Sequence, residues 1–144
     1  MISFARRYLD PFLPLPLRRA AQSLFKVYYN MGDCIFCKIV DGSAKADIVH
    51  RDEQVTAFRD IHPAAPTHIL VIPNKHIESV NVVAAEDELA LGHLFLAAKR
   101  IAEQEGISAN GYRLIVNTGA YAGQVVYHLH LHILGGQPLR HPMG

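Results

Sequence analysis

The chain has 144 residues, of which 50% are hydrophobic and 19% are charged, and its formal net charge is +1. This length and composition predict one globular domain and exclude disordered and fibrous classes of protein. No run approaches the roughly 20 apolar residues needed to cross a bilayer, so no transmembrane segment is expected. The two cysteines, Cys34 and Cys37, are too few for a disulfide framework and favour a reducing, cytoplasmic location.

Residues 1–31 differ in charge from the rest of the chain. They carry five basic residues and one acidic residue, whereas the remainder carries nine basic and twelve acidic residues. The remainder therefore gives no reason to expect nucleic-acid binding. We expect residues 1–31 to be an appendage and residues 32–144 to be the domain. Three interpretations of the appendage remain open: an upstream extension from a misassigned start, a basic arm for a membrane surface or partner, and an organelle presequence.

The first half of the domain predicts one short helix and three strands. A short apolar turn or helix covers 35–40 and ends at Asp41-Gly42. The β-prone segments 48–50 and 54–58 flank a polar turn, which predicts a hairpin. The continuous apolar run 68–72 is ended by Pro73 and predicts a strand in the middle of the sheet.

The second half predicts the long helix and two further strands. Between about Glu86 and Glu105, apolar residues recur at three- and four-residue spacings, acids occupy the first turn, and Gly106 follows the end. Strands are expected at 112–116 and 127–134, joined by a Gly- and Ala-rich loop. The fold class is therefore α+β: a mainly antiparallel sheet of about five strands with one long helix across it.

Three histidines alternate with apolar residues at the end of the chain. In a strand, His128, His130 and His132 share one face, while Leu129, Leu131 and Ile133 share the other. In a helix the three imidazoles would spread over roughly 200 degrees and form no common site. An exposed strand more usually mixes Thr, Lys and Glu, so the clustering favours a chemical role. A metal site and phosphorus chemistry both remain open on the residues alone.

The cysteine pair has the spacing Cys-x-x-Cys. Two thiolates at this spacing can bind one tetrahedral metal, but two ligands alone are a weak signal. The alternative is a pair of reduced, partly buried thiols, and a redox pair is disfavoured because no βαβ pattern surrounds it.

The segment His-Leu-His-Leu-His-Ile-Leu followed by Gly135-Gly136 resembles the signature of the histidine triad family. The resemblance covers about residues 32–144. Other segments similar to the family occur in the family's order: 33–39, 57–61, 65–76 and 123–128. The ending at 134–142 resembles the purine nucleoside phosphoramidase branch, the histidine triad nucleotide-binding proteins.

The resemblance implies a hydrolase that cleaves the P–N bond of purine nucleoside 5′-phosphoramidates. His130 attacks the α-phosphorus, a nucleotidyl-histidine forms, and water releases the nucleoside monophosphate. The alternatives are a dinucleoside polyphosphate hydrolase or nucleotidyl transferase of the same family, and a nucleotide-binding interaction protein of low activity. No organic cofactor is implied.

The resemblance also implies the roles of individual residues. The catalytic set is His130, His132, His128 and His68, in which His132 and the backbone near Gln124 hold the phosphate oxygens. Asp60 accepts hydrogen bonds from the ribose hydroxyls, with a turn-capping aspartate as the alternative. The remaining nucleotide-binding positions are Ile35, Phe36, Ile39, Phe58 and Ile61 around the base, for which core packing is the alternative, and Asn117, Gly123, Gln124 and Val125.

Val125 is a departure from the family pattern, which usually has a Ser or Thr hydroxyl after Gly-Gln. A valine cannot donate a hydrogen bond to the leaving group or to a phosphate oxygen. One lost transition-state hydrogen bond commonly costs about 2 to 4 kcal/mol. We therefore expect slower phosphoramidate turnover than in a Val125→Ser variant.

Zinc and dimerisation are further implications of the resemblance. Zinc-binding bacterial members of the family match the ligand set Cys34, Cys37, His76 and His128. Such a zinc would be structural, with four protein ligands and no open position. A homodimer that joins two sheets is expected, with a purine nucleotide as substrate.

Overall fold

The computed structural model describes residues 33–140. The predicted appendage, residues 1–31, lies outside the described residues. The elements are α2 (Ile35–Asp41), β1 (Ile48–Arg51), β2 (Val55–Arg59), β3 (Thr67–Pro73), α3 (Glu88–Gln104), β4 (Arg113–Ile115) and β5 (Leu131–Gly135), with short 3₁₀ turns at Val80–Val82, Ala85–Asp87 and Ala120–Ala122. Within residues 33–140, no helix combines the length and the apolar character that a membrane span requires.

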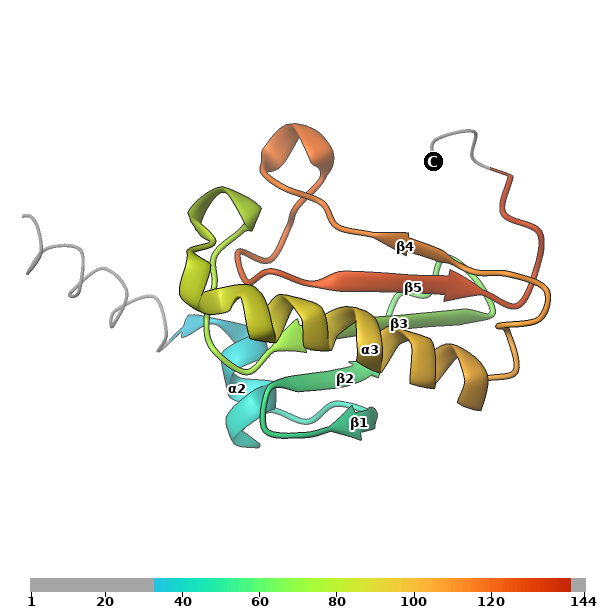
Figure 1. Cartoon of the computed structure of the whole chain (residues 1–144), viewed down its shortest axis with the longest axis horizontal. Coiled ribbons are helices and arrows are strands. Elements are labelled where there is room, and N and C mark those ends of the chain that lie inside the picture. Colours follow the sequence, from blue (N-terminus) through green and yellow to red (C-terminus); the bar gives the residue numbers. More distant parts are fainter. Residues whose placement is uncertain (1–32, 141–144) are drawn as a thin grey trace, which may run out of the picture. The chain divides into compact units, whose positions relative to one another are not determined.

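The five strands form one sheet in the order β1-β2-β3-β5-β4 (Figure 1). Every neighbouring pair is antiparallel. The prediction of an α+β domain with about five antiparallel strands and one long helix is confirmed. β3 lies at the centre and all seven of its residues are buried, as its uninterrupted apolar run predicted.

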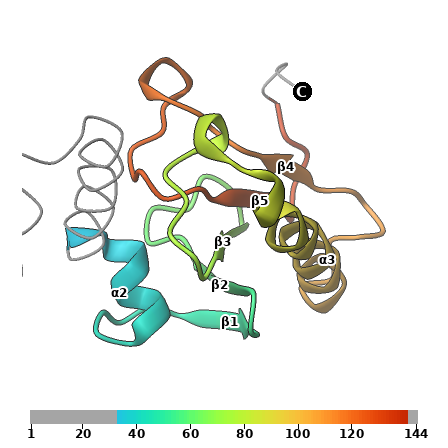
Figure 2. The same cartoon turned by 60° about the vertical axis from the view of Figure 1, so that its left-hand side comes forward.

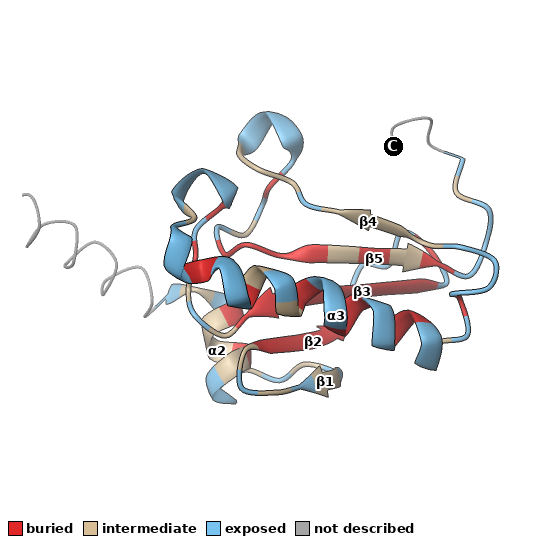
Figure 3. Cartoon of the chain, in the orientation of Figure 1, coloured by how far each residue is buried: buried red, intermediate tan, exposed pale blue. Residues whose placement is uncertain are grey.

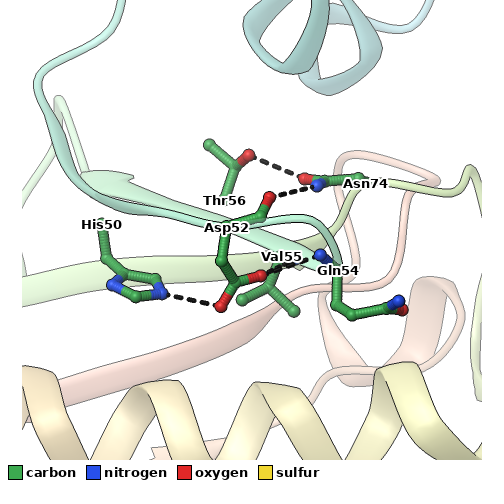
Figure 4. A network of polar contacts seen from close by, with 6 residues as sticks. All are labelled: His50, Asp52, Gln54, Val55, Thr56 and Asn74. Carbon is green, nitrogen blue, oxygen red and sulfur yellow. Dashed lines mark hydrogen bonds and ion pairs between the residues drawn. The ribbon is translucent and has the colours of Figure 1, made fainter.

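The predicted hairpin of β1 and β2 is closed by Asp52 (Figure 4). One carboxylate oxygen of Asp52 accepts hydrogen bonds from the backbone N–H groups of Gln54 and Val55, both at 2.8 Å. The other oxygen lies 3.0 Å from Nε2 of His50. Burial tends to raise the pKa of Asp52, but the hydrogen bonds from His50 and the two N–H groups outweigh it and lower the pKa to about 2.

Helix α3 lies across one face of the sheet and supplies five of the 14 residues of the buried hydrophobic core (Figure 2). Its inward residues Leu94, Ala98 and Ile101 are at most 2% exposed and pack against Val71 and Ile133 of the central strands. Figure 3 shows the contrast between this buried layer and the exposed outer side of the helix. Strand residues alternate in direction, so β2, β3 and β5 direct a second set of side chains to the opposite face.

β5 begins at Leu131, four residues later than the strand predicted at 127–134. The last residue pair between β3 and β5 joins Val71 to Leu131. The next residue of β3 in this register is Ile72, and Pro73 after it has no N–H to donate to a further hydrogen bond. His128 and His130 precede the strand, and only His132 lies within it.

Candidate functional site

The four predicted catalytic histidines gather on the side of the sheet opposite α3. His68 of β3 and His132 of β5 extend from the face opposite Ile69 and Ile133, which belong to the core under α3. The ring centroids of His68 and His132 lie 5.2 Å apart, and those of His130 and His132 lie 4.9 Å apart. The alternation predicted from the sequence therefore holds for the two faces, although the strand is shorter than expected.

His130 has its orientation fixed by a backbone carbonyl. Its Nδ1 lies 2.7 Å from the carbonyl oxygen of His128, and His130 is only 6% exposed. A carbonyl oxygen can only accept, so Nδ1 carries the proton and Nε2 keeps its lone pair. An imidazole in this tautomer can act as a nucleophile through Nε2.

His68 and His132 have the opposite arrangement of protons. The backbone N–H of Ala64 donates to Nδ1 of His68 at 3.0 Å, so the proton of neutral His68 is on Nε2. That Nε2 lies 2.9 Å from Nδ1 of His132, which must accept. The proton of His132 is therefore on Nε2, which is buried and has no hydrogen-bond partner among the described residues. This N–H can serve as a donor to an anionic oxygen.

The pKa values agree with neutral rings. Burial, together with the nearby rings of His130 and His68 and against the opposing effect of Asp60, lowers the pKa of His132 to about 4. Burial also lowers the pKa of His68, which Asp60 partly offsets. Burial lowers the pKa of His128 to about 4 in spite of its hydrogen bond to Pro73. These three imidazoles are neutral at pH 7, as the tautomer assignment requires.

Asp60 lies beside this network and caps a turn, which is the alternative that the sequence left open for it. One of its carboxylate oxygens accepts the N–H of His62 at 2.8 Å, which is the turn-capping bond. The other lies 3.4 Å from Nε2 of His68. The Asp60 side chain is 17% exposed, so part of the carboxylate faces solvent.

The loop before the histidines is held by the side chain of Gln124. Its Oε1 accepts the N–H of Gly119 at 2.9 Å, and its Nε2 donates to the carbonyl oxygen of Glu78 at 2.8 Å. Gly123 has φ +80°, a conformation that favours glycine. The Gln124 side chain is thus committed to the loop, while the next residue, Val125, is 86% exposed.

The predicted base-binding residues divide into two groups. Phe36, Ile39 and Phe58 are at most 7% exposed, so core packing accounts for most of their surface. Ile35 and Ile61 are 46% and 85% exposed and offer apolar surface to a ligand. Asn117 follows β4 and lines a groove formed by β4 and the C-terminal segment.

The four predicted metal ligands are brought together. The ligand atoms of Cys34, Cys37, His76 and His128 all lie within 4.8 Å of one another. Sγ of Cys37 lies 3.2 Å from Nδ1 of His76 and 3.5 Å from Nδ1 of His128, and the two Nδ1 atoms are 3.2 Å apart. Tetrahedral zinc, with bonds of about 2.0 Å to nitrogen and 2.3 Å to sulfur, separates its ligand atoms by about 3.3 to 3.8 Å. The residues fit such an ion.

Proton positions distinguish this cluster from a second one formed by Asp60, His68 and His132. Nε2 of His128 donates to the carbonyl oxygen of Pro73 at 2.8 Å, which leaves Nδ1 as a lone pair facing Cys37. By contrast, Nε2 of His68 carries a proton, because Nδ1 already accepts the Ala64 N–H. The second cluster is therefore a hydrogen-bond network and the first is suited to a metal.

Several groups that shape the site belong to the backbone, so no residue type in the sequence indicates them. The carbonyl oxygens of Pro73 and His128 and the N–H of Ala64 select the three tautomers. Of these groups, only the carbonyl oxygen of Pro73 could have been indicated, by a prediction that the end of β3 lies near the segment before β5. The contact of Phe36 with His130 also depends on the fold, since 94 positions separate the two residues in the sequence.

The fold and the histidine site define the class of this protein. The family model of the HIT domain matches residues 41–139. The chain belongs to the HIT domain family.

Particular relatives are similar over most of their length. The purine nucleoside phosphoramidase of Escherichia coli K12 is 58% identical over 107 residues, which are 74% of this chain and 90% of that protein. A HIT family hydrolase from Legionella pneumophila has a TM-score of 0.75 and 47% identity, over 78% of this chain and all of that one. A Zn-bound histidine triad family protein from Mycobacterium smegmatis has a TM-score of 0.65 and 30% identity, over 73% of this chain and 76% of that one.

Proposed function

We propose that the protein hydrolyses purine nucleoside 5′-phosphoramidates through a nucleotidyl intermediate on His130. The observation that carries the proposal is the hydrogen bond from Nδ1 of His130 to the carbonyl oxygen of His128, which leaves the Nε2 lone pair for attack. The similarity to the E. coli purine nucleoside phosphoramidase supports the choice of substrate.

In the first step, Nε2 of His130 forms a bond to the α-phosphorus as the P–N bond breaks, and the leaving nitrogen takes a proton from solvent to depart as the neutral amine. Nε2–H of His132, which has no partner among the described residues, donates to a phosphate oxygen as negative charge develops there. His130 then carries both an N–H and an N–P bond, and the carbonyl of His128 stabilises the resulting cation. Water attacks the phosphorus in the second step, breaks the N–P bond and releases the nucleoside monophosphate.

The nucleotide is held by groups around this centre. Asp60 retains carboxylate lone pairs beyond its bond to His62, and these accept the ribose hydroxyls. Exposed apolar surface on Ile35 and Ile61 receives the purine. The backbone at Gly123 and Gln124 contacts the phosphate, and Asn117 contacts the sugar or phosphate.

We further propose that Cys34, Cys37, His76 and His128 hold a structural zinc ion. When bound, zinc supplies four fixed bonds and no open coordination position, so it contributes stability and no chemical step. The thiolates remain available only in a reducing compartment, which suits the cytoplasm. The protein purified without a histidine tag is expected to contain about one equivalent of zinc, and less than about a tenth of an equivalent contradicts a closed site.

A homodimer completes the proposal. β4 is an edge strand of three residues with one paired side, and an unpaired strand edge favours association. Leu89, Phe95 and Leu96 of α3 are 54 to 64% exposed and form an apolar surface that a second copy can cover. Light scattering of the full chain is expected to give twice the monomer mass, and a monomer at micromolar concentration contradicts the dimer.

The substrate is tested by incubating the protein with adenosine 5′-phosphoramidate and, separately, with a diadenosine polyphosphate. AMP release from the first should exceed that from the second, and His130→Ala should lower it by about 10³-fold or more, since it removes the nucleophile. His93→Ala, a histidine on α3 away from the cluster, is the matched control. Turnover that survives in His130→Ala contradicts the mechanism, and preference for the dinucleotide contradicts the substrate.

A further inference from the structure

Phe36 packs directly against the nucleophile. Its ring and that of His130 have centroids 5.3 Å apart and an interplanar angle of 88°. The same ring contacts His128 at 5.9 Å and 69° and Phe58 at 5.3 Å and 68°. Phe36 therefore lies between the strand β2 and the segment that carries His128 and His130.

Burial argues against the role that family resemblance gives to Phe36. Only 7% of its surface is exposed, which leaves little for a purine to cover, whereas Ile35 on the preceding position is 46% exposed. The edge-to-face arrangement instead restricts the imidazole of His130, because rotation of that ring about its Cβ–Cγ bond would bring it into the perpendicular phenyl ring.

We propose that Phe36 is a positioning residue that holds the His130 imidazole with Nε2 directed at the phosphorus. Two restraints then act on one ring: the hydrogen bond from Nδ1 to the His128 carbonyl and the perpendicular contact with Phe36. This inference rests on the proposed function, in which His130 is the nucleophile.

The sequence position of Phe36 adds a second consequence. Phe36 directly precedes Cys37, whose Sγ lies 3.2 Å from Nδ1 of His76. Two adjacent residues of α2 therefore have different contacts: Phe36 packs against His130, and Cys37 is a proposed metal ligand. Metal content must be equal in all variants before their rates are compared, and each is therefore reconstituted to the wild-type content.

The test compares Phe36→Leu and Phe36→Met, which lose the ring, with Phe36→Tyr, which keeps it. Leu94→Ala, in the core under α3, is the control for a general loss of stability. Three quantities are measured: kcat for adenosine 5′-phosphoramidate, the dissociation constant of AMP, and the ¹⁵N signals of the His130 ring. The AMP dissociation constant and the ¹⁵N signals are measured without turnover. They therefore test the role of Phe36 even if the protein does not hydrolyse adenosine 5′-phosphoramidate.

Loss of the ring is expected to lower kcat about tenfold or more, to change the AMP dissociation constant less than about twofold, and to replace the single Nδ1–H tautomer of His130 by a mixture. Phe36→Tyr should retain kcat within about threefold, and Leu94→Ala should leave the ¹⁵N signals unchanged. Weaker AMP binding with unchanged kcat would overturn the proposal in favour of a base-binding role. An unchanged His130 tautomer in both ring-free variants would overturn it as well.

Discussion

The two faces of the sheet are built on different principles. Under α3, apolar side chains such as Leu94, Val71 and Ile133 exclude water and form the core. On the opposite face, the buried ring of His68 and the half-buried ring of His132 are held by hydrogen bonds in defined tautomers. The core face stabilises the protein because its apolar surface is removed from water. On the histidine face, part of that stability keeps imidazole nitrogens such as Nε2 of His132 in place, although they have no partner among the described residues. Mutations on the two faces should therefore have separable effects.

The largest expected effect on stability comes from the core face. Leu94→Ala removes a side chain that is 2% exposed and leaves a cavity under α3. The free energy of unfolding should fall by about 2 to 5 kcal/mol, while kcat stays within about twofold of wild type. Urea unfolding and steady-state kinetics measure the two quantities. A large fall in kcat in the folded variant would show that the faces are not independent.

The largest expected effect on activity, apart from loss of the nucleophile, comes from His68→Leu. Without the donor at Nε2 of His68, the proton of His132 can move to Nδ1, and the phosphate loses a donor. A donor of this kind is worth about 3 kcal/mol, so kcat should fall about 100-fold. His62→Leu, an exposed neighbour, is the control for the substitution itself. Equal kcat in the two variants would exclude a role for the tautomer of His132.

The histidine face should also make the protein sensitive to acid. His132 has a pKa of about 4 in the folded state and about 6.5 when unfolded, so the unfolded chain binds more protons between these values. Stability is fully present above about pH 6.5 and is lost as the pH falls toward 4, by at most about 3 kcal/mol from this residue. Urea midpoints at pH 7 and 4.5 should show a smaller loss in His132→Asn than in wild type. Parallel pH dependence in both proteins would contradict the assignment.

A smaller effect is expected at the hairpin turn, which belongs to neither face. Asp52→Ala removes the acceptor for two backbone N–H groups and should lower the free energy of unfolding by about 1 to 2 kcal/mol. Because the pKa of Asp52 is lowered to about 2, this contribution is present above about pH 4 and is lost as the pH falls toward 2. Thermal unfolding of both proteins at pH 7 and 2.5 measures it. A difference in melting temperature that is as large at pH 2.5 as at pH 7 would contradict it.

Periodicity and spacing predicted most of the core face and the outline of the fold. The apolar repeat of α3, the central strand β3 and the hairpin of β1 and β2 all lie within two residues of their predicted limits. These features depend on local patterns, which the sequence displays directly. The late start of β5 was not predicted, because the alternation of apolar residues and histidines continues before Leu131 and does not indicate where the pairing with β3 ends.

The grouping of the candidate site residues was predictable from the sequence, whereas the positions of their protons were not. The alternation of three histidines and the Cys-x-x-Cys pair indicated a chemical role, and the family resemblance supplied their grouping. Which nitrogen carries each proton depends on backbone groups of Ala64, Pro73 and His128. Backbone groups are the same in every residue, so no sequence pattern could reveal these partners.

The central claim is that Nε2 of His130 forms the covalent intermediate, and a rapid quench in alkaline denaturant, which preserves the acid-labile N–P bond, tests it most directly. The wild-type protein is mixed with adenosine 5′-phosphoramidate, quenched within one turnover and digested, and the modified peptide is mapped by mass spectrometry. We predict a single adenylyl group on His130 that is absent from His130→Ala. An adenylyl group on His132 or another residue, or turnover without any covalent adduct at the earliest times, would contradict the account.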